Sequence, residues 1–169
     1  MPARRERPAF DADDRTSLLG WYDLQRGIVT LKCEGLSDED AHRSVIPTSP
    51  LMTVAGIVGH LTWAEQLWFE HAFLGREPEG PGWDDVEDSE FLVQDRSLDE
   101  LLAAYDEQCR RSDDVIASHS LSDTGVGTAF PAAGATLGWM LVHMLEETAR
   151  HAGHLDLVRE LLDGETGYY

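Results

Sequence analysis

The sequence is short of cysteine, of basic residues and of long apolar runs, and each shortage excludes a class of protein. Two cysteines in 169 residues provide neither a disulfide framework nor a cysteine-based zinc motif. Lys and Arg number 13 against 32 Asp and Glu, and the resulting net charge of −19 argues against nucleic-acid and anionic membrane partners. No stretch approaches the roughly 18 consecutive apolar residues of a membrane span. We therefore expect a cytoplasmic protein without nucleic-acid or membrane partners.

The motifs of several enzyme classes are also missing. The sequence contains no nucleophile elbow, no phosphate-binding glycine loop, no dinucleotide fingerprint and no calcium-binding loop. The basic residues at 4–7 are followed by no apolar segment, so we expect no signal peptide. The acidic run at 84–88 is interpreted as a solvated loop.

Hydrophobic residues make up 42% of the chain and recur at helical spacing, whereas no segment alternates as a β-strand would. Four long periodic segments are at about 13–33, 53–74, 97–118 and 136–163. A short helical turn is also predicted near 37–40. Thr53 and the capping box Ser97–Glu100 predict helix starts, and Gly75 predicts a helix end. Long connections, including 76–96, join the segments. The pattern predicts an all-α four-helix bundle with long crossover loops, as one domain over 13–169 after a flexible arm at 1–12.

The last predicted helix carries the main functional signal. His143, Glu147, His151 and His154 lie within twelve residues and, at about 100° per residue, share an arc of roughly 80°. His151 falls in the middle of an apolar stripe and Glu147 near its edge. Ionisable groups on a core-facing stripe are costly unless they are paired or metal-bound. The stripe is formed by Met140, Met144, Leu155, Val158 and Leu162.

The spacing of these residues favours a metal site. Glu147 and His151 are separated by four residues and can hold one ion from one face of a helix, so a facing helix must supply a third ligand. His60 lies on the apolar face of the second predicted helix and is the best-placed third ligand. His71 shares this face but is roughly 16 Å further along the helix, too far to bind the same ion. Two imidazoles and one carboxylate with open positions describe a catalytic type of site for zinc or another late divalent metal.

Three alternatives stay open. His154 could replace Glu147 as a ligand, because a spacing of three residues also places two side chains together. His143 and His154 could instead orient a ligand or accept a proton. A buried Glu147–His151 ion pair would explain the same pattern without any metal.

Two further features concern the second helix. Thr53 to His60 and Thr136 to His143 share an N-cap followed by a histidine seven residues later, which suggests that both helices start at a similar level of the bundle. Gly56 and Gly59 each cost about 1 kcal/mol of helix propensity, so we expect a neighbouring helix or a ligand to approach closely there.

The residues around these ligands resemble a known family. Val58-Gly59-His60-Leu61, together with Glu147-x-x-x-His151-x-x-His154, is similar to the DinB/YfiT-like superfamily over about residues 13–164. The longer string from His143 to Asp156 resembles its actinobacterial branch of uncharacterised DinB-like proteins. The resemblance implies a four-helix bundle whose zinc or nickel is held by three side chains, here His60, Glu147 and His151. Most members of the superfamily use three histidines, and a set of two histidines and one glutamate is similar to that of the mycothiol-dependent maleylpyruvate isomerases. Bacillithiol S-transferases are further relatives.

The resemblance also implies an activity. We expect a metal-dependent enzyme that transfers a low-molecular-weight thiol, mycothiol, to a small electrophile, with the metal lowering the pKa of the thiol. A metal-dependent hydrolase using metal-bound water, and a non-catalytic bundle that binds a metal or a ligand, are the alternatives. A homodimer formed through a helical face is a further implication of the family.

Overall fold

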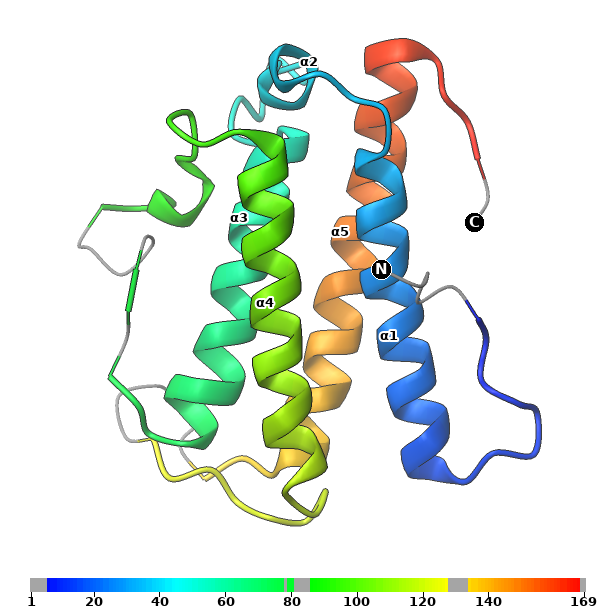
Figure 1. Ribbon diagram of the computed structural model, residues 1–169, viewed down its shortest axis with the longest axis vertical. Helices are drawn as coiled ribbons and strands as arrows, with labels where there is room; N and C mark the ends of the chain where they lie inside the picture. Colours follow the sequence, from blue (N-terminus) through cyan, green and yellow to red (C-terminus); the bar gives the residue numbers. More distant parts are fainter. Residues whose placement is uncertain (1–5, 78, 81–85, 128–133, 168–169) are drawn as a thin grey trace.

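The computed structural model describes residues 6–77, 79–80, 86–127 and 134–167, and these residues form a helical bundle (Figure 1). The predicted all-α four-helix bundle with long crossovers is confirmed. Part of the predicted N-terminal arm and part of the acidic run at 84–88 lie outside the described residues. The helices of the bundle are α1 (Asp14–Cys33), α3 (Val54–Glu65) with its continuation η1 (Gln66–Phe73), α4 (Leu98–Ala117) and α5 (Leu137–Asp163). Two short helices, α2 (Asp38–His42) and η2 (Ser89–Phe91), lie in the connections.

Local capping fixes the starts of the helices. Thr53, Ser97 and Thr136 each accept a hydrogen bond from a backbone N–H three residues later, and Ser97 and Glu100 form the complete capping box. Gly75 has φ +68°, in the left-handed region that commonly ends a helix, as predicted. The second helix differs from the prediction in one respect, because its last eight residues, Gln66–Phe73, form a π-helix.

The helices pack as two parallel pairs. α1 lies beside α5, and α3 lies beside α4, with the second pair running opposite to the first (Figure 1). The rings of His60 and His151 are 4.7 Å apart, and those of Trp68 and His143 are 4.5 Å apart, so α3 and α5 are antiparallel. The prediction that both helices start at a similar level is therefore wrong. α3 starts near the end of the bundle where α5 finishes, which brings His60 to the middle of α5.

A buried ion pair separates two apolar clusters in the core. The side chains of Arg26 on α1 and Glu65 on α3 are 2% and 1% exposed, and two guanidinium nitrogens each lie 2.7 Å from a carboxylate oxygen. Tyr22 donates a hydrogen bond to Glu65 at 2.5 Å, and Arg26 also donates to Asp113 on α4 at 2.7 Å. This network joins α1, α3 and α4 between the apolar cluster around Leu61 and the one around Leu67.

Both cysteines are buried and neither is in a disulfide, Cys33 in α1 and Cys109 in α4. Burial raises the pKa of the Cys33 thiol to about 12, so only about one such group in ten thousand is ionised at pH 8. We expect the folded protein to react very slowly with Ellman's reagent at pH 8, and the unfolded protein to release two equivalents of thionitrobenzoate. Fast release of one equivalent by the folded protein would contradict this burial.

Among the described residues, no helix is both long enough and apolar enough to cross a membrane.

Candidate metal centre

The structure brings together the side chains of His60, Glu147 and His151, with one possible ligand atom from each lying within 4.8 Å of the others. The Nε2 atoms of His60 and His151 lie 3.0 and 3.2 Å from the same carboxylate oxygen, Glu147 Oε1. In a tetrahedral site with bonds of about 2.0–2.1 Å, neighbouring ligand atoms are about 3.3 Å apart. The donor types and their spacing therefore fit a zinc-like divalent ion.

The surroundings keep Glu147 ionised. Hydrogen bonds from His151 and then from His60 hold the pKa of the Glu147 carboxyl well below its usual range, although partial burial acts in the opposite direction. The three side chains are only 11–16% exposed. A carboxylate that stays charged in such a half-buried place is available as a ligand at neutral pH.

His60 is also held from the side opposite Glu147. Its Nδ1 lies 3.4 Å from Glu90 Oε1, and its ring stacks on Phe91 with 4.4 Å between centroids and 11° between planes. With a metal in place of the Nε2 proton that His60 donates to Glu147, the remaining proton is on Nδ1 and is directed at Glu90. Carboxylates that orient a histidine ligand in this way fix its tautomer and increase its basicity.

Two glycines of α3 allow the segment that carries Glu90 and Phe91 to pack against the helix. A Cβ atom on Gly59 would lie 2.7 Å from Val93 Cγ1 and 2.9 Å from the carbonyl oxygen of Glu90. A Cβ atom on Gly56 would lie 3.3 Å from the carbonyl oxygen of Phe91. The nearest atom to a Cβ on Gly56 would be the carbonyl oxygen of Leu51, at 2.6 Å. The expected close approach is therefore made by the connection between η1 and α4 at Gly59, and by this connection together with the residues before α3 at Gly56.

We expect Gly59→Ala to weaken metal binding by about 10–100-fold, the usual effect of disturbing groups that orient a ligand. The added methyl group must push the segment away from α3, and Glu90 and Phe91 then lose their contacts with His60. Titration calorimetry with zinc measures the change. The control is Gly153→Ala, because a Cβ atom there meets nothing within 4 Å and adds only helix propensity. Equal zinc affinity in both variants would exclude a role for this packing.

His154 contacts a candidate ligand without joining the set of three. Its Nδ1 lies 3.4 Å from the Nδ1 of His151, so the Nε2 of His151 is left directed at Glu147. Partial burial, with added effects of His151 and Arg150, lowers the pKa of His154. This geometry favours Glu147 as the third group and His154 as a neighbour that orients His151.

The other two histidines near the site by sequence are placed elsewhere. The ring of His143 stacks on Trp139 and packs edge-on against Trp68, two helical turns before His151. The Nδ1 atom of His71 lies 2.7 Å from the carbonyl oxygen of Arg76, at the end of η1. Neither histidine belongs to the group that could hold a metal.

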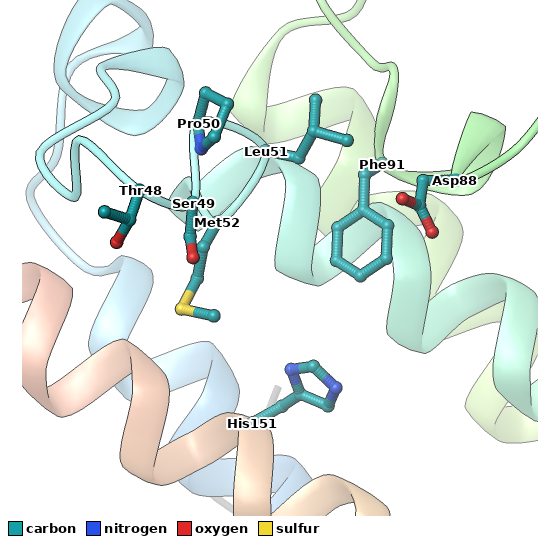
Figure 2. A pocket seen from close by; sticks show the side chains of 8 residues that line it. All are labelled: Thr48, Ser49, Pro50, Leu51, Met52, Asp88, Phe91 and His151. Atoms are coloured by element: carbon teal, nitrogen blue, oxygen red, sulfur yellow. The ribbon is translucent and has the colours of Figure 1, made fainter.

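A pocket of about 390 Å³ opens beside the three residues, and His151 forms part of its wall. Figure 2 shows Met52 and Phe91 pointing toward His151 from two different connections of the chain. The remaining lining residues are Thr48, Ser49, Pro50, Leu51 and Asp88. A second pocket, of about 300 Å³, has none of the three candidate ligands among its described lining residues.

Sequence reasoning missed Glu90 and Phe91 because they lie in a connection without periodicity, the predicted long connection at 76–96. It also missed the buried pair Arg26 and Glu65. A signal for that pair was present, since Arg26 is four residues from Tyr22 and Glu65 is four residues from Leu61 on apolar faces. His151 was selected as an ionisable residue on an apolar helix face, and the same criterion would have selected Arg26 and Glu65.

Comparison with known proteins now identifies the family. The mycothiol-S-transferase family matches residues 17–164 of the chain.

The chain belongs to this family.

A crystal structure of a conserved protein from Enterococcus faecalis superposes with a TM-score of 0.66 at 13% identity, covering 91% of this chain and 99% of that one. At this identity the superposition shows a common fold alone. No curated protein matches the sequence. Membership of a mycothiol-S-transferase family agrees with the DinB-like resemblance of the sequence and points to thiol chemistry.

Proposed function

We propose that this protein is a metal-dependent S-transferase that joins mycothiol to a small electrophile. The observation that carries the proposal is the convergence of two imidazole nitrogens on one oxygen of an ionised glutamate, at the wall of a pocket. Membership of the mycothiol-S-transferase family supports the identity of the thiol. His60, Glu147 and His151 would hold zinc or nickel, which suits two nitrogen donors and one oxygen donor.

A divalent ion bound to these side chains would lower the pKa of a coordinated thiol. The protein's own contribution is to orient the ligands: Glu90 and Phe91 hold the ring of His60, and His154 holds the ring of His151. The half-buried position of the three side chains limits competing water. In the reaction the thiol sulfur bonds to an electrophilic carbon, the leaving group departs with the electron pair of its bond, and the thiol proton passes to solvent.

The test uses protein purified without a metal-chelating tag and loaded with one equivalent of zinc or nickel. Mycothiol and bromobimane are the substrates, and the fluorescent conjugate is measured. We expect conjugation well above the uncatalysed rate, loss of this rate in metal-free protein and in His151→Ala, and lower rates with glutathione or cysteine. Because Cys33 and Cys109 are buried, we expect them to add little to the background.

Two results would reject the proposal. The first is a rate equal to the uncatalysed one with both metals across a panel of electrophiles. The second is consumption of the electrophile at the same rate without any thiol, which would favour hydrolysis.

A further inference from the structure

The pocket beside the candidate metal centre has mainly apolar walls. Pro50, Leu51, Met52 and Phe91 give it apolar surfaces, and hydroxyl groups come from Thr48 and Ser49. Its volume of about 390 Å³ is near the lower end of the roughly 300–1,000 Å³ of ligand pockets, so a small molecule fits it better than a large thiol. The rings of His60 and Phe91 are stacked, and Phe91 also lines the pocket, so a flat ligand can extend the stack.

The charge of the walls excludes one class of ligand. Among the described residues that line the pocket, none is Lys or Arg, and the carboxylate of Asp88 is exposed at its edge. A ligand carboxylate would lose water on entry without gaining a Lys or Arg partner among the described lining residues, and it would meet Asp88. The net charge of −19 opposes the approach of anions further.

We propose that this pocket is the electrophile subsite, that it selects flat, uncharged, apolar molecules, and that Asp88 discriminates against anionic ones. This inference rests on the proposed S-transfer, since it names the class of molecule whose carbon accepts the thiol sulfur. Met52 adapts the subsite to different shapes, because its unbranched thioether chain is flexible. The subsite therefore selects ligands by their charge and flatness more than by their exact shape.

The backbone at Asp88 allows a clean test of its charge. Asp88 has φ 58° and ψ 23°, a left-handed conformation that Asn and Asp tolerate better than other residues with side chains. Its carbonyl oxygen accepts the Phe91 N–H at 3.0 Å, an interaction that does not involve the side chain. Asp88→Asn therefore removes the charge while the position of Phe91 is kept. Glu87→Gln is the matched control, because Glu87 is exposed and is not among the lining residues.

The binding experiment uses the metal-loaded full chain and two unreactive probes, dinitrobenzene and dinitrobenzoate, which differ by one carboxylate. Methyl labelling of methionine gives the readout, because Met52 lines the pocket whereas Met140 and Met144 are fully buried. We expect dinitrobenzene to shift the Met52 resonance and dinitrobenzoate to bind at least about tenfold more weakly. Asp88→Asn should narrow this ratio by about two- to fivefold, the usual size of one partly exposed charge interaction, and Glu87→Gln should leave it unchanged.

The turnover experiment repeats the comparison with chlorodinitrobenzene and chlorodinitrobenzoate in the presence of mycothiol. The neutral electrophile should have the larger kcat/KM, and Asp88→Asn should reduce the difference. If the Met52 resonance responds as expected but no thiol is conjugated, the subsite stands and the S-transfer fails. If conjugation occurs while neither probe shifts Met52, or while Asp88→Asn and Glu87→Gln change selectivity equally, the S-transfer stands and the subsite is overturned.

Discussion

Arg26→Met is expected to lower the free energy of unfolding by about 3–5 kcal/mol, the usual cost of leaving a buried charge without its partner. The carboxylate of Glu65 is 1% exposed and receives two hydrogen bonds from Arg26. Without the guanidinium, its remaining side-chain partners in the described part of the chain are the hydroxyl of Tyr22 and, at a longer distance, the thiol of Cys109. For a domain whose stability is typically about 5–15 kcal/mol, this is a large fraction. Urea unfolding followed by circular dichroism measures the change.

Two variants show whether the isolated charge is the cause. Arg26→Met combined with Glu65→Leu should recover part of the lost stability, because a buried ion pair can often be replaced by apolar residues without net cost, whereas the buried hydroxyl of Tyr22 loses its acceptor. Arg110→Met removes an exposed ion pair with Glu107 and should cost less than about 1 kcal/mol. If Arg26→Met costs no more than Arg110→Met, the buried pair does not contribute as its geometry implies.

The sequence predicts the helices well where local interactions decide. Ser97 and Glu100 satisfy each other's backbone groups within one turn, so the start of α4 could be read without knowing its neighbours. The π-helix at Gln66–Phe73 could not be read in this way. Its apolar residues keep a helical spacing, and its side chains make long-range contacts that the local sequence does not reveal, such as those of Glu70 with Gln108 and Arg111 of α4.

In the candidate site, too, the local arrangement could be predicted from the sequence and the long-range arrangement could not. Glu147 and His151 share a helix, so their proximity follows from helical geometry. The approach of His60 depends on the packing direction of α3 and α5, and the sequence echo between these helices suggested the wrong direction. The fold nevertheless brings His60 to Glu147, because antiparallel packing sets the early part of α3 against the middle of α5.

Glu90 and Phe91 show where sequence reasoning ends. They lie 30 and 31 residues after His60 in a connection that has no repeating pattern. Their contact with His60 depends on how this connection folds back over Gly56 and Gly59. Gly56 and Gly59 predicted that another part of the chain or a ligand packs closely on α3, but they did not identify which one.

His60→Ala and His151→Ala are each expected to reduce metal affinity by more than about a hundredfold, beyond the 10–100-fold range typical of groups that only orient a ligand. Each variant removes one of the two imidazoles that meet at Glu147 Oε1 and leaves at most two ligands. Elemental analysis of protein purified without a chelating tag, and calorimetric titration with zinc, give the occupancy and the affinity. His143→Ala is the matched control on α5, because its ring packs against Trp68 and Trp139. Full occupancy in both His60→Ala and His151→Ala would reject the site.

Comparing Glu147→Gln with His154→Ala decides which residue completes the set. Gln keeps the shape of Glu147 but removes the charge that His151 and His60 stabilise, so it should lose affinity about as severely as His151→Ala. His154→Ala removes only the group beside the Nδ1 of His151, and its loss should stay within about 10–100-fold. The reverse order of affinities would make His154 the ligand. The two imidazoles of α5 would then lie three residues apart, and Glu147 would be the residue that orients them.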